Sequence, residues 1–147
     1  MSTRSPNAFS SPPKSRSALK VLVIDDDPFQ LEFIADALKG LGISDITLAE
    51  SGNKALQAVT ASQGRSGAAF DLMLSDLHMP GMDGFQFMAS AAQSGFKGAL
   101  IIVSGQDSKV VHSATLVAQL RRFNLLGTLQ KPVDSSALFV LVSKIAS

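Results

Sequence analysis

The stretch FDLMLSDLHMPGMDG, residues 70–84, decides the fold of this chain. It begins as a short apolar run typical of a buried β-strand and ends in a glycine- and proline-rich segment that cannot continue a strand. Asp76 lies at the junction, which places it at the carboxyl end of a strand, where open α/β sheets bind their ligands. A carboxylate in this position can be a metal ligand, a nucleophile or both.

Four further apolar runs predict the other strands. Residues 21–24 precede three consecutive aspartates, residues 99–103 precede a serine, residues 125–130 precede a lysine, and residues 46–49 form a weaker run. Five strands alternating with five helical patterns predict an α/β fold, a doubly wound parallel sheet with right-handed crossovers and helices on both faces. The helices are expected after Pro28, after Ser51, from about Asp83 to Gln93, from Asp107 or Ser108 to about Arg122, and after Asp134.

The composition indicates one domain in a reducing compartment. With 147 residues, 46% of them apolar, and a mean hydropathy of +0.24, the chain can form a single well-buried core. The absence of cysteine excludes a disulfide framework, a thiolate metal site and a cysteine nucleophile. No apolar run approaches the roughly 20 residues that span a bilayer, and the N-terminus lacks the apolar region of a secretory signal. We therefore expect a cytoplasmic protein that does not contact a membrane.

The first 18 residues differ from the rest of the chain. They contain six serines and three of the six prolines but almost no large apolar side chains, so they predict a disordered extension before a domain of residues 19–147. Four of the 13 basic residues precede Asp25, which leaves nine against 12 acids in the remainder. That balance argues against nucleic-acid binding by the folded part.

The polar residues that follow the strands predict a shared site. In a parallel sheet the carboxyl ends of the strands lie on one edge, so Asp25, Asp26, Asp76, Ser104 and Lys131 should converge there. Carboxylates packed together repel one another unless a cation offsets their charge. Hard oxygen ligands that leave room for water and a phosphate oxygen suit Mg²⁺, and a lysine beside them suits an anion that arrives with the metal.

Four motifs make the chain resemble the CheY-like receiver domain of two-component response regulators. They are VLVIDDDP (21–28), FDLMLSDLHMPGMDG (70–84), LIIVSG (100–105) and LQKPV (129–133), in the order typical of that family. The resemblance covers roughly residues 19–146. It implies a flavodoxin-like five-stranded sheet of order 2-1-3-4-5.

The resemblance also implies a role for each site residue. Asp76 resembles the phosphoacceptor, whose carboxylate attacks a phosphohistidine of a histidine kinase or phosphotransfer protein. Asp25 and Asp26 resemble the pair that binds Mg²⁺ together with Asp76, with the backbone carbonyl of His78 as a further ligand. Ser104 resembles the switch hydroxyl. Lys131 resembles the lysine that pairs with the phosphoryl group, and the bond between it and Pro132 is expected to be cis.

The segment before Lys131 departs from the family pattern. Thr128 occupies the position where receivers commonly carry a switch aromatic, so no ring can report phosphorylation there. The spacing from Ser104 to Lys131 is longer than in most receivers, which predicts an extended fourth helix or exit loop. Residues 112–132 resemble receivers attached to cyclic-di-GMP phosphodiesterase domains. Signalling is expected to pass to a downstream protein target or output domain, and the chain alone leaves open whether it is a whole protein or part of a larger regulator.

Two sets of apolar residues exceed what the core stripes require. Phe29, Phe33 and Ala37 follow a second line on the first helix, either as part of a wide buried face or as a docking strip for a kinase or phosphotransfer helix. Phe139 and Val140 on the last helix indicate a partner surface. The resemblance allows a homodimer through the fourth helix, fifth strand and last helix.

Two other functions fit some of the same residues. Asp25 and Asp27 satisfy the Asp-x-Asp motif of haloacid-dehalogenase-like phosphatases, with Lys131 as the third motif, but the later acidic motif is missing and Asp76 would have no role. A pseudo-receiver would keep the fold as a binding module without phosphorylation, and the intact acidic and lysine positions argue against it. The helix caps Asp27 and Asp83 are expected to be structural.

Overall fold

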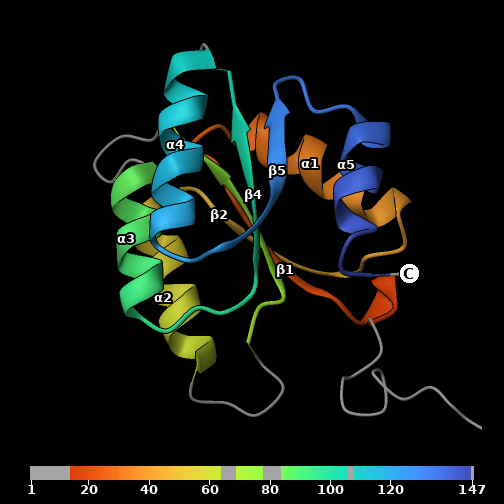
Figure 1. Ribbon diagram of the computed structural model, residues 1–147. Helices are drawn as coiled ribbons and strands as arrows, with labels where there is room; N and C mark the ends of the chain where they lie inside the picture. The colour runs from red at the N-terminus through yellow and green to blue at the C-terminus, as the bar shows by residue number, and fades with distance from the viewer. Residues whose placement is uncertain (1–13, 64–68, 78–83, 106–107, 147) are drawn as a thin grey trace, which may run out of the picture.

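The computed structural model describes residues 14–63, 69–77, 84–105 and 108–146. They form a five-stranded parallel sheet in the order β2-β1-β3-β4-β5 with five α-helices (Figure 1). The predicted doubly wound fold and strand order are confirmed. In chain order the elements are β1 (Lys20–Ile24), α1 (Pro28–Gly40), β2 (Asp45–Ala49), α2 (Gly52–Gln63), β3 (Leu72–Asp76), α3 (Gly84–Gln93), β4 (Ala99–Ser104), α4 (Ser108–Leu120), β5 (Asn124–Gln130) and α5 (Ser135–Val142).

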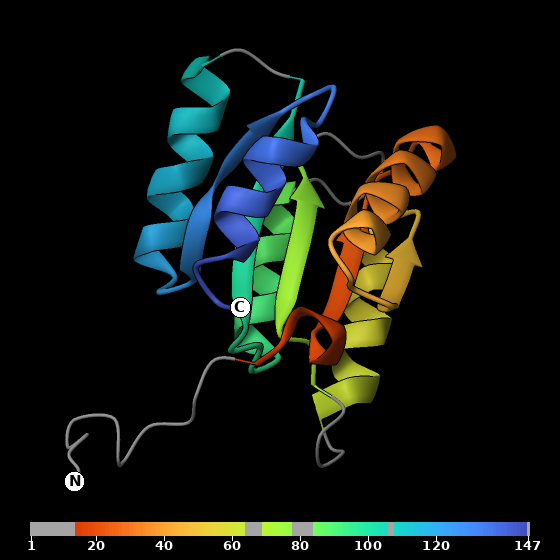
Figure 2. The same ribbon diagram turned by 90° about the vertical axis from the view of Figure 1, so that its right-hand side faces the viewer.

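Helices cover both faces of the sheet and create two apolar cores. Helices α1 and α5 pack on one face, and α2, α3 and α4 pack on the other (Figures 1 and 2). Alternate residues of β1 and β3 serve the two cores, so that Val21 and Val23 face α1 and α5 while Leu22 and Ile24 face the other helices. Because both faces of these strands are buried, their sequences are continuous apolar runs.

Two helix caps next to the strand ends behave as the sequence predicts. Asp27 precedes α1 and accepts a hydrogen bond from the Phe29 N–H at 2.9 Å. Asp134 precedes α5 and accepts one from the Ala137 N–H at 3.0 Å. These side chains satisfy orphan N–H groups in the first turn of each helix. The expected cap at Asp83 and the expected alternative cap Asp107 lie outside the described residues.

A β-bulge in β5 lies between Ser104 and Lys131 in the sequence. The pairing of β4 with β5 shifts between Leu100, which faces Leu125, and Ile101, which faces Gly127, so Leu126 is an extra residue. The expectation of extra length in the fourth helix or its exit loop stays a prediction. Gly127 fits because a Cβ there would lie 2.7 Å from Leu141 Cδ2 of α5.

Residues 14–18 are ordered, although the composition assigned them to a disordered extension. Lys14 forms a 3.0 Å ion pair with Asp71 and a backbone bridge with Ala146. The Arg16 Nε donates to the Leu41 carbonyl at 2.6 Å, and its guanidinium lies 5.4 Å from the centre of the Phe139 ring. These tertiary contacts, which a composition argument does not include, order this part of the expected extension. The rest of that extension lies outside the described residues.

Surface exposure separates the two interpretations of the apolar strip on α1. Phe29 is 82% exposed and Phe33 is 46% exposed, whereas Ala37 packs partly against the core. The wide buried face is therefore wrong for the two phenylalanines. On α5, Phe139 and Val140 are also exposed, as expected. Among the described residues, the helices are all too short or too polar to cross a membrane.

Candidate functional site

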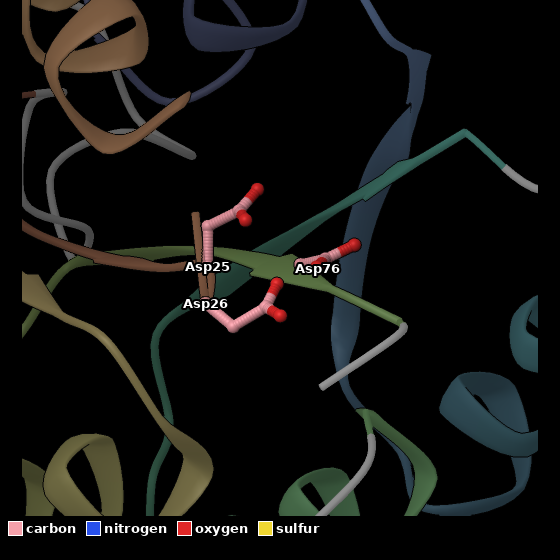
Figure 3. Close-up of side chains that lie close together, drawn as sticks. All are labelled: Asp25, Asp26 and Asp76. Atoms are coloured by element: carbon pink, nitrogen blue, oxygen red, sulfur yellow. The ribbon is translucent and has the colours of Figure 1, made fainter. Parts of the chain in front are cut away.

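Three aspartates gather at the carboxyl edge of the sheet. Asp76 is the last residue of β3, and Asp25 and Asp26 directly follow the adjacent strand β1. One carboxylate oxygen from each lies within 4.8 Å of the others, and Figure 3 shows the side chains extending from the two strand ends into the same region. Asp25 and Asp76 are buried, and Asp26 is exposed. The predicted convergence of these three residues is confirmed.

Backbone and side-chain contacts fix the β1 end of this cluster. The Asp25 N–H donates to the Ala49 carbonyl at 3.1 Å, which extends the β1–β2 pairing by one residue. Asp25 Oδ1 accepts a hydrogen bond from the Asp27 N–H at 2.9 Å. Because the Asp27 carboxylate caps α1, it has a structural role at the start of the helix. Ala49 was not predicted as part of the site, because it contributes only a backbone carbonyl.

Lys131 joins the buried carboxylates by ion pairs. Its Nζ lies 2.7 Å from Asp25 Oδ2 and 3.3 Å from Asp76 Oδ1, although it comes from beyond the far strand β5. Burial alone lowers the pKa of the Lys131 ammonium. The hydrogen bond to Asp25 and the charges of Asp76 and Asp25 more than offset this, so the net pKa is raised above its ordinary value. The lysine is therefore firmly cationic at neutral pH.

Ser104, at the end of β4, and Lys131, just after β5, lie at the same edge of the sheet. Ser104 is 1% exposed, and its carbonyl accepts a hydrogen bond from the Lys131 N–H at 3.0 Å. The bond between Lys131 and Pro132 is cis, as predicted. Thr128 pairs with Ile102 and is exposed, so the position that the sequence singled out lies at the surface of β5.

The donor set suits a hard divalent cation. Three carboxylates from two strand ends supply oxygen ligands, one of them open to solvent, which leaves room for water and for an oxygen of an incoming anion. Lys131 supplies a positive charge that contacts both buried carboxylates. This edge thus has the ligands that could hold a metal ion and a cation beside a buried carboxylate. The predicted ligand His78 lies outside the described residues.

Two residues beside Asp76 were not predicted as part of the site. The buried Ser75 hydroxyl donates to the Asp76 carbonyl at 3.3 Å. Gly84, the first residue of α3, donates its N–H to the Leu77 carbonyl at 3.0 Å. Both act on the backbone near Asp76. Their contacts depend on the folded backbone, so the pattern of residue types along the chain does not predict them.

The fold and this acidic edge define a class of phosphoryl-accepting signalling domains, and comparison with known proteins gives the family. The family described as "Response regulator receiver domain" matches residues 21–143, and the chain belongs to it. Phosphorylation of an aspartate in the presence of Mg²⁺ is the general function of this family. Its members act in two-component systems with histidine kinases and output domains.

Relatives of several architectures are similar to this chain. It is 33% identical over 127 residues to the cyclic di-GMP phosphodiesterase RocR of Pseudomonas aeruginosa. The matched region is 86% of this chain but only 31% of RocR, so the chain spans about a third of that relative. It is 33% identical over 111 residues to a probable chemotaxis protein CheY of Rhizobium etli, covering 74% of this chain and 79% of that protein. The Mg²⁺-complexed receiver domain of the histidine kinase CKI1 from Arabidopsis thaliana has a TM-score of 0.67 and 26% identity, covering 86% and 94% of the two chains.

Proposed function

We propose that Asp76 is the phosphoacceptor of this receiver and that Asp25, Asp26 and Asp76 hold Mg²⁺. The observation that carries the proposal is the placement of Asp76, buried at a strand end beside an acidic pair and within 3.3 Å of the Lys131 ammonium. A carboxylate oxygen of Asp76 would attack the phosphorus of a phosphohistidine. The phosphorus–nitrogen bond would break, and the imidazole would leave with the electron pair.

The neighbouring residues neutralise and sense the transferred group. Phosphoryl transfer depends mainly on positioning and on charge neutralisation. Bound Mg²⁺ would offset the charge of the carboxylates and of the phosphoryl oxygens. Lys131 would move from carboxylate to phosphoryl oxygens, and the Ser104 hydroxyl would turn toward them. With His78 as a carbonyl ligand, these assignments make the chain a signalling phosphoacceptor without turnover of free substrates.

Substitution of the phosphoacceptor tests this function. A small phosphodonor such as acetyl phosphate with Mg²⁺ should add one phosphoryl group to the chain, and Asp76→Asn should abolish the addition because an amide is a poor nucleophile. Intact mass spectrometry before and after incubation measures this. The matched control is Asp45→Asn, at the start of β2 and so at the opposite edge of the sheet from Asp76, which should label normally. Undiminished labelling of Asp76→Asn would refute the assignment.

The partner of this site is proposed to be a histidine kinase or a histidine phosphotransfer protein that docks on α1. Phe29 and Phe33 are exposed on the helix that starts just after the acidic pair, so a partner covering them would lie next to Asp76. The exposed Phe139 and Val140 on α5, with β5 and α4, form the proposed surface for a downstream protein or a second copy.

The phosphatase alternative loses its main support in the structure. Its motif requires the Asp27 carboxylate at the reacting centre, whereas this carboxylate caps α1 through the Phe29 N–H. A steady-state assay with a small phosphate ester separates the two functions. Multiple turnovers would overturn the receiver proposal.

A further inference from the structure

Gly84 makes an unusually close approach to the backbone that carries Asp76. A Cβ built on Gly84 would lie 2.7 Å from the Leu77 Cα and 2.9 Å from the Asp76 carbonyl oxygen, both closer than real Cβ atoms come to other atoms. The Gly84 N–H also donates to the Leu77 carbonyl at 3.0 Å. Helix α3 therefore begins in direct contact with the peptide group between Asp76 and Leu77.

The same peptide group is held from the strand side. Asp76 pairs with Val103 of β4, and the Ser75 hydroxyl donates to the Asp76 carbonyl at 3.3 Å. The partners of the Asp76 carboxylate, by contrast, come from other strands, since Asp25 follows β1 and Lys131 follows β5. A shift of the Asp76–Leu77 peptide would thus move one member of the site relative to the others.

We propose that Gly84 is a positioning residue, whose lack of a side chain lets α3 start against the Asp76–Leu77 peptide and so sets the Asp76 carboxylate relative to the metal-binding aspartates and Lys131. This inference rests on the proposed function of Asp76. A side chain at Gly84 must push α3 or the strand end aside, because the nearest atoms are backbone. Misplacement of a reacting group by about 1 Å can slow a reaction about 100-fold.

The test compares Gly84→Ala with Gly98→Ala. A Cβ on Gly98 would be equally crowded, 2.7 Å from the Phe70 carbonyl oxygen and 2.8 Å from that of Asp71, but at the opposite end of β3 and β4. Both variants should unfold at lower urea concentration. At a temperature where circular dichroism shows both folded, only Gly84→Ala should slow phosphoryl addition from acetyl phosphate, by about 10-fold or more, and weaken Mg²⁺ binding measured by calorimetry. Gly98→Ala should stay within about twofold of the wild type.

Each outcome bears on the inference. Equal rates and Mg²⁺ affinities for Gly84→Ala and wild type would overturn it, as would an equal loss in both variants, which would indicate general destabilisation. If the wild type accepts no phosphoryl group, the proposed function fails, and the Mg²⁺ affinities of the two variants still decide the positioning role. If Gly84→Ala does not fold, Ser75→Ala replaces it. Its control is Ser62→Ala, which removes another buried hydroxyl bonded to a backbone carbonyl. Ser75 holds the same Asp76–Leu77 peptide that Gly84 contacts, so a rate and Mg²⁺ affinity of Ser75→Ala equal to those of the wild type would mean that the placement of this peptide does not set the site, which would overturn the inference.

Discussion

At the scale of single residues, the site depends on opposite charges brought together from distant parts of the chain. Asp25 and Asp76 are almost fully buried, and Lys131 offsets their charge at 2.7 and 3.3 Å. Burying a carboxylate is costly unless it is paired. The same lysine that is proposed to contact the phosphoryl group therefore stabilises the unphosphorylated protein as well.

Removal of this lysine should destabilise the protein in the absence of metal. Breaking a buried ion pair costs about 3–5 kcal/mol, and since the Lys131 side chain is 20% exposed, we expect Lys131→Met to lose about 2 kcal/mol in EDTA. Mg²⁺ should restore part of the loss by supplying another cation. Urea unfolding followed by circular dichroism measures both effects, because the chain has no Trp or Tyr to serve as a fluorophore.

A lysine on the outer surface provides the control for this substitution. Lys54→Met on α2 replaces an exposed side chain and should change the free energy of unfolding by less than about 0.5 kcal/mol. Equal stability of Lys131→Met and wild type in EDTA would mean that the buried carboxylates do not need the ammonium.

At the scale of elements, α1 combines two functions along its length. Leu31, Ile34 and Leu38 bury one face against the sheet, while Phe29 and Phe33 remain exposed near its start. A large aromatic side chain that stays exposed gains nothing from core packing, which favours its use in binding another protein. The position next to the acidic pair suits the partner that donates the phosphoryl group.

Replacement of the most exposed phenylalanine should slow transfer from a protein donor only. We expect Phe29→Ser to reduce the rate of phosphotransfer from a phosphorylated histidine protein about 10-fold or more, as for loss of an aromatic anchor worth at least about 1.4 kcal/mol. The rate with acetyl phosphate should not change, because Asp76 and its partners are untouched. Phosphotransfer from a radiolabelled donor protein gives the first rate, and intact mass spectrometry after incubation with acetyl phosphate gives the second.

Leu120 offers a matched control, since it is also 82% exposed but lies at the end of α4, at the opposite edge of the sheet from Asp76. Leu120→Ser should leave both rates unchanged. Equal slowing by the two substitutions, or none by Phe29→Ser, would argue against docking on α1.

At the scale of the whole molecule, the acidic edge couples metal binding to folding. The three carboxylates come together only when β1 and β3 pair, so the unfolded chain has no comparable site. Mg²⁺ should therefore stabilise the folded state by about 2.7 kcal/mol at 100 times its Kd. Thermal unfolding with and without MgCl₂, at matched ionic strength with NaCl, should show a rise in Tm.

Asp26→Asn identifies the source of this stabilisation. Asp26 is exposed, so its substitution should leave the metal-free protein folded while most of the Mg²⁺-dependent rise in Tm is lost. A rise of the same size in Asp26→Asn and wild type would mean that Mg²⁺ binds elsewhere or acts nonspecifically.

The local pattern of the sequence predicted the elements and the residues at their ends. Apolar runs of strand length followed by polar residues located β1 and β4 to within a residue, and β3 at its end but two residues too early at its start, because strands buried on both faces must be apolar throughout. The aspartate caps of α1 and α5 could also be predicted from the sequence, because each capping hydrogen bond joins residues only two or three apart. The convergence of Asp25, Asp76 and Lys131 followed from the parallel topology alone.

The sequence by itself thus determined the alternating elements, the acidic edge and the family, because these depend on periodicity and on which residues follow a strand, and the resemblance to the family implied the strand order. Only the tertiary structure decided the exposure of Phe29, the bulge at Leu126, the ordered contacts of Lys14 and Arg16, and the close approach of Gly84 to Asp76. Each of these depends on how distant segments pack, and the bulge and the Gly84 contact also involve backbone atoms that every residue has. Side-chain patterns along the chain carry no record of such contacts.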